Sequence, residues 1–464
     1  MIDNNLKKNY LLYLSLFFLI SLIMSVSPTL EQGDTLALLN GVDAAIKCID
    51  SKELYNCKEN IIHFPIFQYL IGYPLKKIGF NSQEILKVFI HISSITFLAS
   101  LVCYYRVGYK YAGQNGGILS ILLILSGYLT WYSRSTFNES AAFFLFTYLV
   151  YLIIMDGSLY KLLLTILLCV ITKEVAAPII IYILLITFLF KHGSIDKGYI
   201  KLLKLNIILV IPILIGVLIN TLFNYLRFGV FYNKFNVDPI LMANLKDTIL
   251  NFIYLFVSPN SGLIFVWTSL FFLIVLEGLI LLKSNDYFKK LLFWIILLGI
   301  AFVNLGLAKW FSPFGWVTWG PRLTLPYLGG FVLLMVTISI KDISTYLQNL
   351  KPNQFLIYFL FISNISFLIN IGALIDTSII YNHVFSPTKT IIESGISPFA
   401  VQIVPREIFF KGLHEQMSRF IPLTIYFDIF LRNITFLILF ELNLFLLAYF
   451  YIKNRSLNYE ISKK

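Results

Sequence analysis

Long apolar runs follow one another along most of the chain, and short polar stretches separate them. A helix of about 20 apolar residues can cross a bilayer, and the pattern predicts about twelve such spans. The predicted spans cover residues 10–27, 85–105, 117–132, 141–155, 159–172, 175–190, 202–223, 263–282, 291–308, 323–340, 355–375 and 434–451. The sequence therefore predicts an all-α fold, a polytopic bundle of membrane helices.

Three longer polar segments lie between these spans, at residues 28–84, 224–262 and 376–433. With a cytoplasmic N-terminus, all three fall on the outer face, and most Lys and Arg residues of the short loops fall inside, as the positive-inside rule requires. Within the first segment, residues 64–78 predict an amphipathic helix that lies along the membrane surface. We therefore expect the chemistry of the protein in its outer loops.

Composition agrees with a membrane protein. Of the 464 residues, 58% are hydrophobic and 13% are charged, which is more apolar surface than a soluble core can bury. The formal net charge of +12 comes largely from the short loops, where it meets anionic headgroups rather than nucleic acid. Cys48 and Cys57 share the first outer segment, and whether they pair as a disulfide depends on an oxidising compartment.

Ionisable residues gather at the outer ends of the spans, where an unpaired charge is costly and therefore marks a candidate site. A carboxylate there can take a proton from an acceptor hydroxyl, and Lys or Arg can hold a phosphate that departs from a sugar. The candidate catalytic residues are Asp34 and Glu139. The candidate phosphate-binding residues are Lys173, Arg322, Arg134, His63 and Arg227.

Each of these residues also has a purely structural interpretation. Asp34 precedes Thr35 and would cap the helix that follows, and Glu139 would favour the start of its helix electrostatically. Lys173 would reach the headgroups by snorkelling. Five scattered histidines and the lack of an Asp-x-Asp pair give no support for a metal site, so we expect no required cofactor, although a divalent cation is compatible with the sequence.

Five short motifs, in this order along the chain, resemble those of the GT-C glycosyltransferases, which take a sugar from a polyprenyl phosphate. They are residues 33–37 (GDTLA), 63–69 (HFPIFQY), 133–139 (SRSTFNE), 224–229 with 258–263 (NYLRFG, SPNSGL) and 319–326 (WGPRLTLP). The superfamily includes protein O-mannosyltransferases and the lipid A aminoarabinose transferase. The resemblance covers residues 1–340, which would form one catalytic module that includes outer loop 28–84. Residues 341–464 would add membrane helices and an outer cap at 376–433.

The resemblance implies an inverting transfer of a hexose or pentose from a polyprenyl-phosphate-linked donor to a glycan, lipid or protein acceptor. Asp34 would deprotonate the acceptor, and the phosphate would leave into a cationic pocket that includes Lys173 and Arg322. The family often has paired acids where this chain has Glu31 and Asp34, so either of the two is a candidate base. The expected location is the inner membrane of a prokaryotic cell, with the site on the periplasmic or extracellular face.

Two other functions compete with this interpretation. A glycan polymerase or ligase of the O-antigen type would instead centre on Arg406, His414 and Arg419 in the last outer segment. A transporter or flippase for a lipid-linked glycan would show charged residues at mid-membrane and paired broken helices in two related halves. The clustering of charge at the outer ends argues against the transporter, whereas in the polymerase or ligase Asp34 and Glu139 would be dispensable.

Overall fold

A computed structural model describes residues 2–25, 66–136, 138–193, 195–233, 245–257, 262–309 and 321–349, with a few residues near the C-terminus (370, 435, 438–439, 441–446 and 449). Within these ranges the chain is helical and contains no strand, which confirms the predicted all-α class. The helices are α1 (Ile2–Ser25), α3 (Ile66–Lys77), α4 (Ser82–Leu125), α5 (Leu129–Tyr132), α6 (Glu139–Ile154), α7 (Leu159–Thr172), α8 (Ala176–His192), α9 (Ile195–Phe228), α11 (Leu245–Val257), α12 (Leu263–Val266), α13 (Thr268–Lys283), α14 (Tyr287–Ala308) and α15 (Leu325–Asn349).

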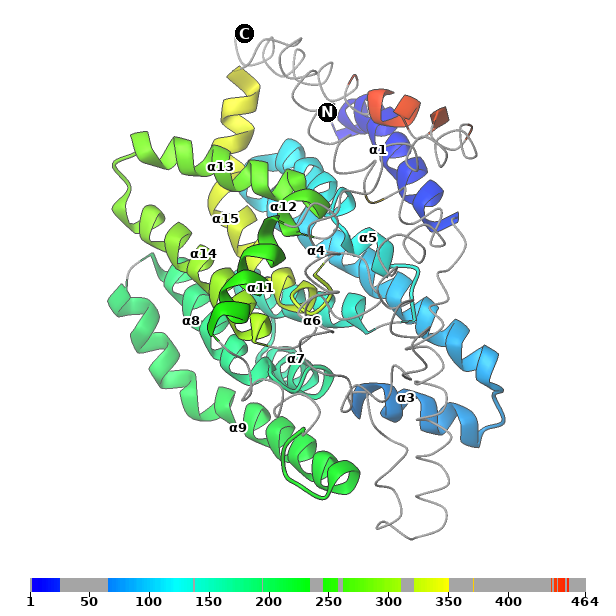
Figure 1. Ribbon diagram of the computed structural model, residues 1–464. Coiled ribbons are helices and arrows are strands. Elements are labelled where there is room, and N and C mark those ends of the chain that lie inside the picture. The colour runs from blue at the N-terminus through cyan, green and yellow to red at the C-terminus, as the bar shows by residue number, and fades with distance from the viewer. Residues whose placement is uncertain are drawn as a thin grey trace.

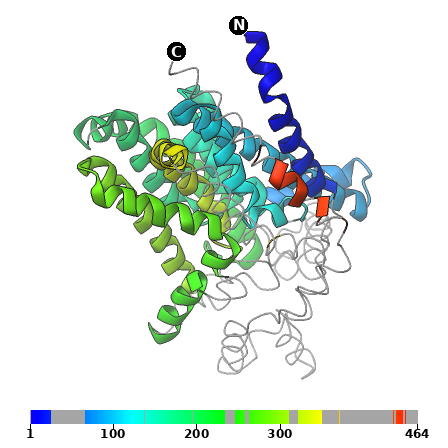
Figure 2. The same ribbon diagram turned by 90° about the horizontal axis from the view of Figure 1, so that it is seen from above.

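The core of the bundle is built by α4, α6 and α15, which pack against one another (Figure 1). In the most apolar window of α15, 83% of the residues are buried, against 33% for α9, which contacts α7 and α8 and lies at the edge of the bundle. At one side of the bundle, α1 packs against residues 441–446 (Figure 2), where Ser15 Oγ donates a hydrogen bond of 3.0 Å to Asn443 Oδ1. The exposed apolar side chains of α9 and α14 suit contact with lipid.

Helix α4 is two helices joined by a sharp reversal. Its 44 residues are interrupted at Ala112 and Gly113, and Gly113 has a left-handed φ of 63°. A Cβ on Gly108 would lie 2.4 Å from the carbonyl oxygen of Gly116, whereas residues eight apart in a straight helix are separated by about 12 Å. The chain therefore doubles back: the first arm contains the predicted span 85–105, and the second contains residues 117–125 of the predicted span 117–132.

The structure agrees with an integral membrane bundle of helices, but it does not confirm the predicted number of about twelve spans. Four described helices are long and apolar enough to cross a membrane: α4, residues 208–226 of α9, α14 and α15. Five shorter apolar helices of 10–17 residues accompany them, among them α6, α7 and α8. The predicted spans 355–375 and 434–451 lie largely outside the described residues.

The prediction that residues 224–262 form a polar outer loop is wrong in two places. Helix α9 continues to Phe228, and α11 occupies Leu245–Val257. Thirteen residues are too few for a span, but the apolar side of α11 packs on α14, where Leu255 is buried with Ala308 and Asn251 Nδ2 donates to the Ala308 carbonyl at 3.0 Å. By contrast, α3 (Ile66–Lys77) confirms the helix that the sequence predicts at residues 64–78.

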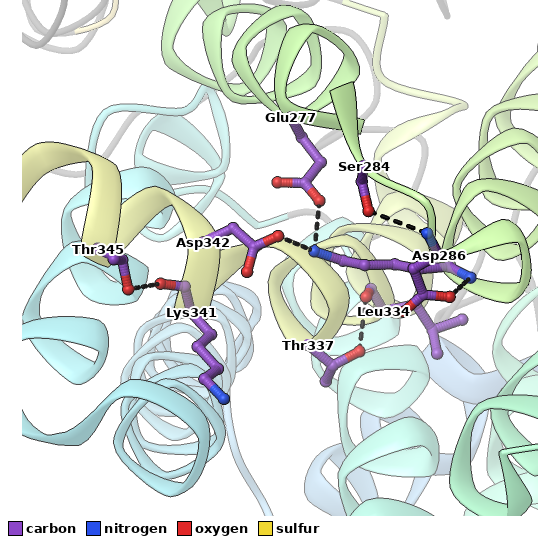
Figure 3. A network of polar contacts seen from close by, with 9 residues as sticks. Glu277, Ser284, Asp286, Leu334, Thr337, Lys341, Asp342 and Thr345 are labelled. Atoms are coloured by element: carbon purple, nitrogen blue, oxygen red, sulfur yellow. Dashed lines mark hydrogen bonds and ion pairs between the residues drawn. The ribbon is translucent and has the colours of Figure 1, made fainter. Parts of the chain in front are cut away.

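A group of charged side chains joins α13, α14 and α15 where α13 ends and α14 begins. Lys289 Nζ lies 2.7 Å from Glu277 Oε1 and also contacts Asp342 Oδ2. Figure 3 shows Glu277 and Asp342 approaching the same nitrogen from two different helices. We call Glu277, Lys289 and Asp342 the Glu277 cluster.

Candidate active site

The starts of α6 and α15 lie side by side because the two helices touch through their backbones. A Cβ on Gly329 would lie 2.2 Å from the carbonyl oxygen of Phe143, so only glycine fits at this crossing. The Tyr104 hydroxyl fixes the same place by donating to the Gly329 carbonyl at 2.8 Å. Glu139 is one turn before Phe143, and Arg322 is about two turns before Gly329. The crossing thus brings an acid and a cation to the same end of the bundle.

Three of the predicted site residues meet at this end. Lys173, the first residue after α7, places its Nζ 3.2 Å from Glu139 Oε1. Arg322 Nε lies 3.5 Å from the same carboxylate oxygen. The side chains are largely buried, with exposed fractions of 3% for Glu139, 14% for Lys173 and 12% for Arg322. We call these three residues the Glu139 cluster.

The charges of the Glu139 cluster do not balance. Two cations share one carboxylate, so the three residues together have a formal charge of +1. Burial lowers the pKa of Lys173, Glu139 opposes that shift, and the charge of Arg322 adds to it. Glu174, the next residue, also raises the Lys173 pKa slightly, and its Oε2 accepts a hydrogen bond of 2.8 Å from Asn233. An anion placed here would relieve the repulsion between the two cations.

One oxygen of the Glu139 carboxylate has no hydrogen-bond partner within the described ranges. Glu139 Oε2 is buried and accepts no hydrogen bond from any residue that the structure describes. An unsatisfied buried carboxylate oxygen costs free energy unless something else donates to it. Lys173 also has unused hydrogen-bonding capacity. The described chain offers acceptors for two of its three N–H bonds, Asn138 Oδ1 and Glu139 Oε1. The cluster thus retains capacity for a ligand.

The remaining predicted residues do not join this cluster in the described structure. Arg134 turns toward α4, where its guanidinium donates to Ser94 Oγ at 3.4 Å, and partial burial lowers its pKa. Arg227 lies in the last turn of α9 rather than in a loop. Asp34 and His63 lie outside the described residues, and so do Glu31, Cys48, Cys57 and the rival set Arg406, His414 and Arg419. Their roles stay predictions.

Sequence reasoning missed Asn138, which precedes Glu139 and contacts Lys173. At this turn the candidates from the sequence were Arg134 and Glu139, and the contact of Asn138 with Lys173 joins residues that are 35 apart in the chain. The one feature of the sequence that could have identified Asn138 is its position next to Glu139, a candidate catalytic acid. As for metals, the described ranges bring together no group of three or more His, Cys, Asp or Glu residues that could hold an ion.

Comparison with known proteins gives matches among solved structures. No protein-family model matches the chain, and no curated protein does. The crystal structure of ArnT from Cupriavidus metallidurans bound to undecaprenyl phosphate matches with a TM-score of 0.48 and 10% identity, over 96% of this chain and 77% of that one. ArnT from the same organism in the apo state gives a TM-score of 0.41 and 11% identity, over 95% and 76%.

At these scores and identities the two matches carry no conclusion about the chemistry of this chain.

Proposed function

We propose that this chain is a membrane glycosyltransferase that moves a sugar from a polyprenyl-phosphate donor to a glycan, lipid or protein acceptor. One observation carries the proposal: Lys173 and Arg322 converge on a single oxygen of Glu139, at the ends of membrane helices. A surplus of positive charge in a largely buried site is suited to a phosphate, and Arg in particular binds phosphate through two parallel hydrogen bonds.

The position of the cluster suits a donor that is anchored in the membrane. Lys173 and Arg322 lie at helix ends, where the phosphate of a lipid would sit while its polyprenyl chain remains among the acyl chains. Their side chains are 14% and 12% exposed, so the cluster is sheltered from water but still open to a ligand. In such surroundings, electrostatic stabilisation of a departing phosphate is worth more than in bulk water.

The distribution of basic residues supports the non-cytoplasmic face as the site of reaction. At the opposite end of α6, Lys110 Nζ donates to the Ile154 carbonyl and Lys191 Nζ to the Ile153 carbonyl, both at 2.8 Å. Lys283, the last residue of α13, and Lys289, in the first turn of α14, lie at that same end. This excess of lysine is typical of the cytoplasmic side of a membrane protein. The Glu139 cluster would therefore face outward.

The reaction follows from these parts. The acceptor oxygen attacks the anomeric carbon, the bond from that carbon to the phosphate oxygen breaks, and its electron pair leaves with the phosphate. The acceptor proton passes to a carboxylate, for which the sequence predicts Asp34 or its neighbour Glu31. Lys173 and Arg322 neutralise the charge that grows on the leaving phosphate, and Glu139 holds the two cations in place. Attack opposite the leaving group inverts the anomeric carbon.

The test is release of free polyprenyl phosphate from a panel of lipid-linked sugars by the protein in nanodiscs. We expect turnover of at least one donor, and about a 100-fold fall with Arg322→Ala and with Asp34→Asn, equivalent to about 2.7 kcal/mol of transition-state stabilisation. The control is Lys283→Ala, which removes an exposed lysine at the other end of the bundle and should leave turnover unchanged. Equal turnover by Arg322→Ala and the wild type would refute the phosphate site. No turnover of any donor would refute the proposed activity.

A further inference from the structure

Asn138 occupies the N-cap position of α6 but does not cap that helix. Its backbone has φ −84° and ψ 2°, outside the extended region that N-cap residues adopt, and its side chain makes no capping hydrogen bond. An Asn used as an N-cap stabilises a helix by about 1 kcal/mol. This side chain is 5% exposed and serves a different contact.

The amide of Asn138 bridges the end of α7 and the ammonium group of Lys173. Its Nδ2 donates to the carbonyl of Thr172, the last residue of α7, at 3.3 Å, and its Oδ1 accepts from Lys173 Nζ at 2.9 Å. A carbonyl can only accept and an ammonium can only donate, so one orientation of the amide satisfies both partners. The Thr172 carbonyl therefore fixes the direction in which Oδ1 points.

We infer that Asn138 is a positioning residue, which holds the Lys173 ammonium beside Glu139 so that its third N–H bond faces the donor phosphate. This inference rests on the proposed function. With Asn138 Oδ1 at 2.9 Å and Glu139 Oε1 at 3.2 Å, two of the three N–H bonds of Lys173 are directed by neighbouring residues of the same turn. An ammonium held in this way loses little freedom when a phosphate binds.

A second asparagine provides a matched control. Asn220 of α9 also donates to a carbonyl near the end of α7, that of Val170, at 2.7 Å, and it is similarly buried at 6% exposed. Its Oδ1 accepts no hydrogen bond from the residues that the structure describes. Replacement of Asn220 by Leu therefore removes the same kind of bond to the same helix without a direct contact to Lys173.

The experiment compares Asn138→Leu, Asn138→Asp and Asn220→Leu in nanodiscs with two readouts. The first is amine labelling of Lys173 as a function of pH, measured by peptide mass spectrometry, which needs no turnover. Asn138→Leu should shift the Lys173 labelling curve to lower pH because an acceptor is lost. Asn138→Asp should shift it to higher pH because a negative charge is added. Asn220→Leu should not move it.

The second readout is donor kinetics. Asn138→Leu should raise the KM for the lipid-linked donor about tenfold, the size expected for a hydrogen bond to a charged group, with a smaller change in kcat. Labelling curves that coincide for the wild type and both Asn138 variants would overturn the inference, as would an equal effect of Asn220→Leu. If the wild type turns over no donor, the proposed function fails, while the labelling curves still decide whether Asn138 positions Lys173.

Discussion

Within the described residues, two clusters of three charged side chains have opposite compositions. In the Glu139 cluster two cations share one carboxylate, whereas in the Glu277 cluster two carboxylates share one cation. They lie at opposite ends of the bundle: Arg322 precedes α15, and Asp342 is 17 residues beyond the start of that helix, about 26 Å along its axis.

The two clusters contain the same kinds of side chain, but the exposure of the excess charge differs between them. Glu277 is fully buried, and the second acid of its cluster, Asp342, is 37% exposed, so water can solvate the excess negative charge. The excess charge within the Glu139 cluster sits on side chains that are at most 14% exposed, which suits the cluster to an anionic ligand. We therefore interpret the Glu277 cluster as a structural clamp on α13, α14 and α15, and the Glu139 cluster as a binding site.

The largest effect on stability is expected from Lys289→Met. This change leaves the buried Glu277 carboxylate without its cation, and removal of one partner of a buried ion pair costs about 3–5 kcal/mol. Unfolding in mixed detergent micelles, monitored by circular dichroism, measures it. Lys283→Met removes the exposed lysine that ends α13 and should change the free energy of unfolding little. If the two variants unfold alike, the Glu277 cluster is not a clamp.

Arg322→Ala should show the reverse pattern, a large loss of turnover and a small loss of stability. Lys173 remains to pair with Glu139, so the buried carboxylate keeps a cation. We expect turnover to fall about 100-fold while the free energy of unfolding changes by about 1 kcal/mol or less. Arg322→Lys, which keeps the charge but not the paired N–H groups, should recover part of the activity. A loss of stability comparable to that of Lys289→Met would contradict a binding role.

The pH dependence of donor use should report Lys173. Its pKa is lowered, chiefly by burial, so the ammonium binds phosphate fully below this pKa and loses its proton at lower pH than an ordinary lysine. The value of kcat/KM for the donor should therefore decline on the alkaline side, and Lys173→Arg should move the decline to higher pH because Arg stays charged. Superimposable pH profiles for the two proteins would show that Lys173 does not titrate in the reaction.

The smallest effect is expected from Asp342→Asn. Asp342 is the more exposed acid of the Glu277 cluster, and its loss leaves Lys289 and Glu277 as a balanced pair. The free energy of unfolding should change by about 0–1 kcal/mol, the range for exposed ion pairs. The same unfolding assay measures it, and a cost near that of Lys289→Met would mean that both acids are needed.

The sequence predicted the helices well where hydrophobic length alone decides. Residues 159–172 were assigned to one span, and α7 covers the same residues. Hydrophobic length does not predict α11, because its thirteen residues are too few for a span and the helix packs sideways on α14. The reversal at Ala112 and Gly113 falls between the two predicted spans 85–105 and 117–132, so the hydropathy pattern located it, although the close contact between Gly108 and Gly116 is a tertiary feature that no such pattern contains.

The candidate site was predicted in its members but not in its arrangement. Glu139, Lys173 and Arg322 were chosen separately, as ionisable residues at helix ends. Their convergence depends on the crossing of α6 and α15 at Gly329, which is a tertiary contact. Asn138 was missed because its partners, Thr172 and Lys173, are 34 and 35 residues away along the chain.

The central claim is that the Glu139 cluster binds the phosphate of a polyprenyl phosphate, and direct binding tests it without any assumption about the sugar. Native mass spectrometry would compare polyprenyl phosphate with the uncharged polyprenol on the wild type, Arg322→Ala and Lys283→Ala. We predict that the wild type and Lys283→Ala retain the phosphate and bind polyprenol much more weakly, and that Arg322→Ala loses this preference. Equal binding of phosphate and polyprenol by the wild type, or an undiminished preference in Arg322→Ala, would contradict the claim.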